Sequence, residues 1–384
     1  MRRACCSRPL RQDPCSPPSR CAAWKGISTR PGSRLRRRGG GSCHDGPEER
    51  CAARHLARHL ASADAAGRGA GGRPGRRWSA RLHEGAPARP PGPGRVILVT
   101  GSTGLTGRAV ARSLDGRAPL RLALRNPGGA ADLAVRGERV RFDFDDPASF
   151  GPALSGVTGV YLLRPPAMAR PAAFEPLLAA MRAAGVRRVA FLSVRGAESI
   201  PLLPHRGIER RIEGSGLAWT HLRPSDFMQN FETVHRADIR DRGELWAPAG
   251  GGRASWVDVR DVAEAAARVL TEEGHAYRAY ALTGPEALGF EDAARLFSAH
   301  VGHEVCYRRP SLPRYLWHQH RARRPAAFAL VMAGIYTAQR LGLAAGTTPD
   351  LPRLIGRAPG SLERYIAGCS HQWRKPGGPA GATV

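Results

Sequence analysis

The stretch that decides the fold is RVILVTGSTGLTGRAVARSL, residues 95–114. Its continuous apolar run over 96–100 predicts a β-strand buried on both faces, and residues 106–114 have the spacing of an amphipathic helix. Three glycines between them form a G-x-x-G-x-x-G pattern. In such a turn the first glycine permits the bend, the second admits a pyrophosphate and the third lets the helix approach the strand. Free N–H groups at the helix start favour an anion. The stretch therefore predicts a dinucleotide-binding turn formed by Gly101, Ser102, Thr103, Gly104, Leu105, Thr106 and Gly107.

Strand and helix patterns alternate after this turn. Helices are predicted over 172–185 and 205–216, and further strands over 120–125, 140–144, 159–163, 187–194 and 218–224. Such alternation is typical of a parallel sheet covered on both faces. We therefore predict an α/β fold in which residues 95–224 form a Rossmann-type, doubly wound NAD(P)-binding domain.

The remaining chain predicts a smaller α/β lobe over 225–365, which completes the same fold and covers the carboxyl edge of the sheet. Its strands are expected over 279–284 and 304–310, and its helices over 257–270, 290–302 and 312–343, the last broken near Pro325. Residues 366–384 read as a flexible tail because the sequence ends in Gly, Pro and Ala.

Charge is concentrated near the N-terminus. The 384 residues carry 59 Lys and Arg against 32 Asp and Glu, a formal net charge of +27. Residues 1–94 hold 20 of these basic residues and 6 of the acidic ones, which accounts for +14. Rich in Arg, Gly and Pro and poor in branched aliphatics, this segment is expected to be disordered. A nucleic-acid-binding arm and a transit peptide are two interpretations; we favour upstream sequence translated from a wrongly chosen start codon, which makes a nucleic-acid partner unlikely.

Cysteine usage and hydropathy exclude several classes. Only Cys306 and Cys369 lie outside residues 1–94, so no disulfide framework is expected. Cys and His residues at 43, 44, 51 and 55 match no standard zinc spacing, and no metal is predicted. No apolar run is long enough for a membrane span, and no signal-peptide pattern is present. We therefore expect a cytoplasmic protein.

The ends of the second and third strands indicate which cofactor is preferred. NAD-binding turns place an acidic residue at the end of the second strand, where it meets the ribose hydroxyl. Arg125 stands there instead, and an arginine suits a 2′-phosphate, so NADP(H) is favoured over NAD(H). Asp143, near the end of the third predicted strand, is a candidate acceptor for the adenine amino group; the alternative is an ordinary turn residue.

Several motifs occur in the order of a known family. The segments VTGSTGLTG, LALRNP, FDFDDPASF, GVYLLRPP, VRRVAFLSV, HRGIERRIEGSGLAWTHLRPSDFMQN and WVDVRDVAEAAARVL resemble the NmrA-like branch of the atypical short-chain dehydrogenases/reductases. The resemblance covers about residues 95–365 and implies a Rossmann domain, an NADP(H) site and a variable C-terminal lobe. It places the following candidate residues around the cofactor besides the turn, Arg125 and Asp143: Phe144, Leu163, Arg164, Pro165, Ser193 and Pro224.

The catalytic machinery of ordinary short-chain dehydrogenases is missing. Their tyrosine is activated by a lysine four residues later, but this chain has only Lys25 and Lys375 and no Y-x-x-x-K. Ser193 and His205 are the catalytic candidates. The alternatives are a capping serine and a surface histidine near a helix start. Four side chains could form an apolar wall for an aromatic substrate or belong to the core: Tyr161, Phe227, Met228 and Trp256.

Two functions follow from this pattern. The first is an NADPH-dependent reductase of a quinone-like or conjugated small molecule, because such acceptors take a hydride without a strong protein acid. The second is a non-catalytic NADP(H) redox sensor of the NmrA type. An aromatic small-molecule substrate and a monomeric or dimeric state are expected.

Overall fold

The computed structural model describes residues 95–129, 134–165, 168 and 170–375. The predictions that concern residues 1–94, including the basic segment and its Cys and His residues, lie outside this part of the chain.

A seven-stranded parallel sheet organises the structure, in the order β3-β2-β1-β4-β5-β6-β9. The strands are β1 (Val96–Val99), β2 (Leu120–Leu124), β3 (Glu138–Arg141), β4 (Val157–Leu163), β5 (Arg188–Leu192), β6 (Ala218–Pro224) and β9 (Arg278–Leu282). The chain changes winding direction between β1 and β4, which is the point where such sheets bind ligands. This arrangement confirms the predicted Rossmann-type fold.

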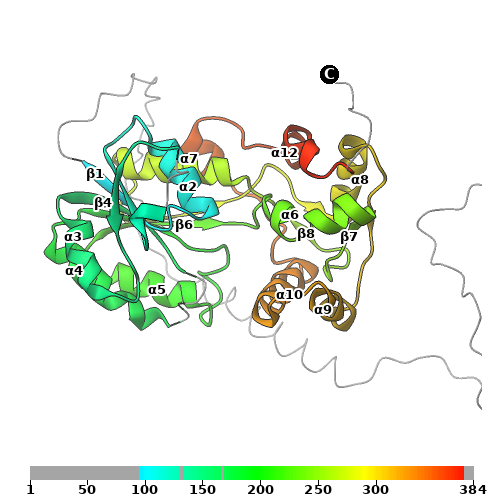
Figure 1. Cartoon of the computed structure of the whole chain (residues 1–384), viewed down its shortest axis with the longest axis horizontal. Coiled ribbons are helices and arrows are strands. Elements are labelled where there is room, and N and C mark those ends of the chain that lie inside the picture. Colours follow the sequence, from blue (N-terminus) through cyan, green and yellow to red (C-terminus); the bar gives the residue numbers. More distant parts are fainter. Residues whose placement is uncertain (1–94, 130–133, 166–167, 169, 376–384) are drawn as a thin grey trace, which may run out of the picture. The chain divides into compact units, whose positions relative to one another are not determined.

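Helices cover both faces of the sheet (Figure 1). One face carries α2 (Leu105–Leu114) and α7 (Val259–Thr271); the other carries α3 (Phe150–Leu154), α4 (Glu175–Ala183) and α5 (Pro204–Glu213). Successive β1 residues supply both cores, since Ile97 and Val99 pack toward α2 while Leu98 packs on the opposite side. Burial on both faces explains the unbroken apolar run in the sequence.

A second core forms the C-terminal lobe. It contains α6 (Asn230–Thr233), α8 (Phe290–Val301), α9 (Leu312–Arg321), α10 (Ala326–Arg340) and α12 (Leu362–Cys369). Short strand pairs join β7 (Glu244–Leu245) to β11 (Cys306–Tyr307) and β8 (Arg253–Ala254) to β10 (Leu288–Gly289). The predicted break near Pro325 is confirmed between α9 and α10. Within the described ranges, no helix is both long and apolar enough to span a bilayer.

Parts of the predicted lobe belong to the sheet instead. Helix α7 packs on α2, and β9 joins β6 as the seventh strand. Helix α11 (Asp350–Ile355) packs on both α7 and β9. The chain therefore enters the lobe after β6, returns to the sheet with α7 and β9, and enters the lobe again with α8, α9 and α10. It then returns to the sheet with α11 and enters the lobe once more with α12.

Three element boundaries also differ from the predictions. Strand β3 begins earlier and ends at Arg141, and the strand predicted over 304–310 is only two residues long. The expected flexible tail from residue 366 was wrong for its first ten residues. Helix α12 continues to Cys369, and the Trp373 side chain is fully buried against Phe297. Burial of the Trp373 side chain explains why this segment packs on the lobe, although the rest of its composition predicts a flexible tail.

Candidate functional site

The turn between β1 and α2 has a backbone that favours glycine at two positions. Gly101 has a φ of +62°, and a Cβ atom there would lie 2.4 Å from Leu163 Cδ2. A Cβ atom on Gly107 would lie 2.2 Å from the Gly101 carbonyl oxygen. The helix thus approaches the turn more closely than any other residue would permit, as a pyrophosphate cradle requires.

The hydroxyl groups of Thr100 and Ser102 stabilise this turn through hydrogen bonds to the backbone of β4 and β1. The buried Thr100 hydroxyl donates to the Tyr161 carbonyl at 2.9 Å and accepts from the Leu163 N–H at 3.1 Å. Ser102 is also buried, and its hydroxyl donates to the Val99 carbonyl. No side chain caps the start of α2, and its first turn contains no acidic residue. The exposed N-terminus of α2 is therefore suited to an anion, and the residues present fit a dinucleotide phosphate.

The other predicted cofactor residues lie along the same edge of the sheet, since all strands run parallel. Arg125 follows β2 directly, and Leu163 ends β4 with Arg164 and Pro165 beyond it. Ser193 follows β5, and Pro224 ends β6. Each of the neighbouring strands β2, β1, β4, β5 and β6 therefore has at least one predicted cofactor residue at its carboxyl end.

Residues at the outer end of this edge have distinct environments. Arg125 is exposed directly after β2, the strand that pairs with β1. Asp143 lies past the end of β3, and its Oδ1 accepts a hydrogen bond from the Asp145 N–H. This is the turn role that the sequence left open for Asp143. Phe144 packs its ring against Phe142 and Phe174, at centroid distances of 5.0 and 5.9 Å.

His205 is held by an arginine rather than by a carboxylate. Arg164 Nε donates to His205 Nε2 at 3.4 Å, and the same guanidinium donates to the Met168 carbonyl at 3.0 Å. Burial and the charge of Arg164 lower the pKa of His205 to about 4, against a smaller opposite effect of Glu209. The imidazole is therefore neutral near pH 7. It has no proton to spare as a general acid, and its contact favours a role in fixing Arg164.

Ser193 is buried beside a charge network under the sheet edge. Glu209, fully buried on α5, accepts two hydrogen bonds of 2.9 Å from Arg223 and one of 3.1 Å from Arg206. Burial raises the pKa of Glu209, but the hydrogen bonds from Arg223 outweigh it and hold this pKa below its usual range. Ser193 is only 2% exposed, and its hydroxyl has no hydrogen-bond partner among the described residues.

The same network contains a geometry that resembles a metal site. Glu209, Glu213 and His221 each place one ligand atom within 4.8 Å of the others. The two guanidinium groups already bind Glu209, and their positive charge opposes a cation at this place. We therefore assign the cluster as a buried ion-pair network that fixes α5 on β6.

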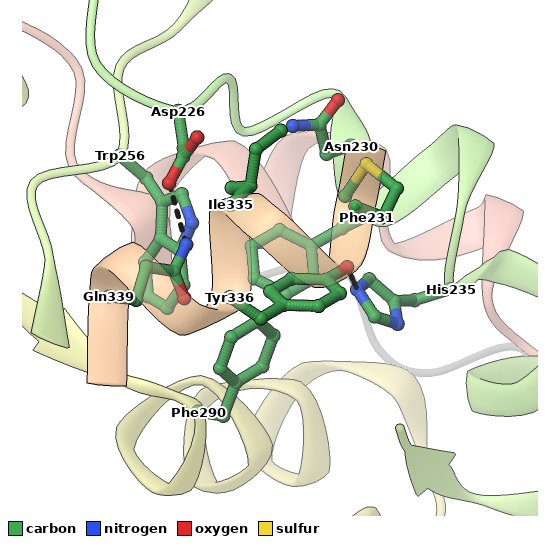
Figure 2. A pocket seen from close by; sticks show the side chains of 10 residues that line it. Asp226, Asn230, Phe231, His235, Trp256, Phe290, Ile335, Tyr336 and Gln339 are labelled. Atoms are coloured by element: carbon green, nitrogen blue, oxygen red, sulfur yellow. Dashed lines mark hydrogen bonds between the residues drawn. The ribbon is translucent and has the colours of Figure 1, made fainter. Parts of the chain in front are cut away.

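A narrow pocket in the lobe has room for about one water molecule between its side chains (Figure 2). Asp226, two residues beyond β6, lies on one side, where its Oδ2 accepts from Gln339 Nε2 at 2.6 Å. On another side the Tyr336 hydroxyl lies 2.9 Å from His235 Nε2. Aromatic rings of Phe231, Trp256 and Phe290 complete much of the lining.

The pairing of Asp226 with Gln339 is not evident from the sequence. Asp226 lies within the SDFMQN segment, which the resemblance had marked as important, but Gln339 is 113 residues further along the chain. The available signal was a buried glutamine on the otherwise apolar side of α10.

Of the two alternatives for the four aromatic and methionine side chains, the core holds for most of them. Trp256 lines the pocket, whereas Tyr161 is fully buried in the core beneath α2. Met228 is part of the lobe core, and Phe227 packs against the core of the sheet. The residues just after β6 contribute to two separate cores, one beside the sheet and one in the lobe.

Comparison with known proteins agrees with this architecture. Residues 93–319 match the NmrA-like family, so the chain belongs to that family. It is 32% identical over 268 residues to an NAD(P)H azoreductase of Xenophilus azovorans, an alignment that covers 68% of this chain and 93% of the relative.

Two solved structures extend the comparison to three dimensions. The Citrobacter sp. triphenylmethane reductase complexed with NADP(H) is 28% identical, with a TM-score of 0.65, and 72% of this chain covers 99% of it. An NADPH-dependent quinone oxidoreductase of Escherichia coli complexed with NADPH is 26% identical, with a TM-score of 0.66. Here 71% of this chain covers 99% of that protein.

Proposed function

We propose that this protein is an NADPH-dependent reductase of a quinone-like or otherwise conjugated aromatic molecule. The observation that carries the proposal is the glycine cradle at the start of α2, where a Cβ atom at Gly101 or Gly107 would collide with neighbouring atoms. The named reductases with the same fold support it, since they are described as using NADPH or NAD(P)H.

Preference for NADP(H) is assigned to Arg125. Its side chain is exposed and follows β2, where a ribose 2′-phosphate is expected in this fold. A guanidinium forms charge-assisted hydrogen bonds to phosphate oxygens, whereas an acidic residue at this position would repel them. Asp143 and Phe144 are proposed to border the adenine end, and residues 163–165, Ser193 and Pro224 the nicotinamide end.

The chemistry required of the protein is mainly positioning. When bound, a reduced nicotinamide supplies a hydride, that is, a proton with two electrons, to an acceptor that is already electron-poor. The chain has no Tyr–Lys dyad with which to polarise an unactivated ketone. Arg164, fixed by His205, and the backbone after β4 and β6 are proposed to orient the two reactants.

Turnover tests this proposal and separates it from a redox sensor. The full chain is mixed with NADPH and either menadione or an azo dye, and absorbance at 340 nm is followed. We expect acceptor-dependent oxidation of NADPH, faster than with NADH. Tight NADPH binding without turnover of any acceptor would favour the sensor, and absence of nucleotide binding would contradict both functions.

A further inference from the structure

Helices α9 and α10 carry most of the large apolar side chains that the described chain leaves exposed. The two helices pack against each other and on the lobe core, where the rings of Tyr315 and Tyr336 meet (Figure 1). Nine such side chains are exposed among the described residues, and six of them lie between residues 312 and 343: Leu312, Trp317, Leu330, Val331, Leu341 and Leu343. Monomeric soluble proteins rarely gather exposed apolar side chains in this way unless the surface binds something.

The outward side of α10 is apolar along about three turns. Leu330 and Val331 are 61% and 62% exposed, and Gly334 and Leu341 follow at helical spacing on the same side. A helix on the surface of a soluble protein normally presents polar residues there. Because Leu330 and Val331 are so widely exposed, they project as a ridge and do not line a recess.

The neighbouring helix α9 presents a basic and aromatic side. Arg314, Trp317 and Arg321 recur at helical spacing, and all three are exposed. The Arg321 guanidinium lies over the Trp317 ring, 5.0 Å from its centre. This ring is more than half exposed, so α9 offers solvent a large amphipathic side chain beside two cations.

No acidic residue accompanies these arginines in the sequence. Residues 305–349 contain seven arginines and no Asp or Glu. Arg308 and Arg309 pair with Glu244 and Glu291. Within the part of the chain that the structure describes, the other five form no ion pair with a carboxylate: Arg314, Arg321, Arg323, Arg324 and Arg340. The surface of α9 and α10 thus combines apolar side chains with uncompensated positive charge.

We propose that this α9–α10 surface binds the face of a membrane that carries anionic lipids, and lies on it without spanning it. Arginines on one side of a helical surface and Trp and Leu on the adjoining side are typical of helices that lie in a membrane interface. In this arrangement the headgroup phosphates pair with the arginines, and the Trp317 ring lies at the level of the headgroups. Leu330 and Val331 then enter the acyl chains.

Charge and shape favour lipid over a protein partner. A two-fold dimer through α10 places the same surface opposite itself, so the arginines of both copies face one another with no acidic residue between them. An acidic protein would need a groove that fits the ridge of Leu330 and Val331. Fluid acyl chains accept a projecting ridge without a matching shape.

Vesicle binding by the full chain tests the proposal. Vesicles of phosphatidylcholine, with and without phosphatidylglycerol, are titrated, and bound protein is separated by flotation. Because residues 1–94 are also basic, the test compares variants of the full chain. Leu330→Ser with Val331→Ser should weaken binding to the phosphatidylglycerol vesicles about tenfold at unchanged net charge. The control is Leu202→Ser, since Leu202 is 94% exposed in the loop before α5 and should have no effect.

The contribution of positive charge is measured in the same assay. Arg314→Gln with Arg321→Gln should also weaken binding about tenfold, and the loss should shrink as the salt concentration rises. Arg182→Gln with Arg187→Gln is the matched control, because it removes the same charge from exposed positions at and after the end of α4. Equal losses in the two double variants would overturn the assignment to α9.

Contact between Trp317 and lipid is tested by fluorescence. Brominated acyl chains quench tryptophan only on contact, so the quenched fraction should fall in Trp317→Phe. Wild-type vesicle binding by the Leu330→Ser, Val331→Ser variant would overturn the proposal. Absence of vesicle binding by the wild type would also overturn it, and a dimer that the same variant dissociates in ultracentrifugation would then identify a second copy as the occupant.

Discussion

The β1–α2 turn and the lobe pocket are built in opposite ways. The turn needs seven consecutive residues, and its geometry follows from backbone positions that exclude any side chain at Gly101 and Gly107. The pocket joins Asp226 to Gln339, 113 residues apart, and depends on how α6, α8 and α10 pack. The turn is thus a local backbone device that belongs to the family fold, whereas the pocket is a long-range assembly of side chains in which this chain can differ from its relatives.

The turn and the pocket also differ in their charge and exposure. The turn lies at an open edge with an uncapped helix N-terminus and the exposed Arg125, as an anionic ligand requires. The pocket is lined by aromatic rings, by the Asp226 carboxyl group paired with Gln339, and by His235, whose pKa burial lowers to about 4.

Removing the Trp373 ring should have the largest effect on stability, and this effect concerns the lobe rather than the β1–α2 turn. Trp373→Ala leaves a cavity beside Phe297 and Tyr365 in the lobe core, and such substitutions cost about 3–5 kcal/mol. Urea unfolding measures the loss. The control is Trp317→Ala, because Trp317 is 56% exposed and should cost less than about 1 kcal/mol. Equal stabilities of the two variants would contradict an ordered C-terminal segment.

A methyl group at Gly107 should damage the turn and spare the pocket. Gly107→Ala places a Cβ atom 2.2 Å from the Gly101 carbonyl oxygen, which forces α2 away from the turn. We expect NADPH affinity to fall about 100-fold, which corresponds to about 2.7 kcal/mol, by calorimetry. Gly151→Ala on α3 is the matched control, since no atom lies within 4 Å of its Cβ position. Unchanged affinity in Gly107→Ala would rule out the cradle.

Acid should destabilise the sheet through a buried histidine. Burial lowers the pKa of His221 to about 4, although Glu209 and Glu213 oppose the shift. The unfolded chain then binds more protons below pH 6.5, so stability is full above that pH and falls toward pH 4. For His221 the loss between pH 7 and pH 5 is about 2 kcal/mol.

His221→Phe keeps the stacking on Trp219 and removes this titration. Its unfolding free energy should depend on pH less steeply between 6.5 and 4, and the remaining slope should come from groups such as His205 and His235, whose pKa values are also about 4. An identical slope in wild type and variant would show that His221 does not titrate in this range.

Loss of Arg125 should have a smaller and more selective effect. Arg125→Ala removes a guanidinium at the place proposed for the 2′-phosphate, so NADPH should bind about tenfold more weakly while NADH binding stays the same. Arg136→Ala is the control, since this side chain is 87% exposed and precedes β3 at the other end of the sheet. An equal loss for both nucleotides would move the phosphate contact elsewhere.

Sequence reasoning succeeded where structure is local. The run at 96–100, the glycine spacing and the break at Pro325 each depend on residues close together, and the fold follows from them. It failed where distant segments meet. The return of α7 and β9 to the sheet and the burial of Trp373 depend on contacts that no local pattern encodes. The protonation state of His205 could not be predicted from the sequence, because burial and the charge of Arg164 lower its pKa only after folding.

Calorimetric titration of the full chain with NADPH and with NADH tests the central claim most directly. The account predicts saturable binding of NADPH with one site per chain, and NADH binding at least tenfold more weakly. Absence of binding by either nucleotide would contradict it, and the glycine turn would then be a feature of the fold without a ligand.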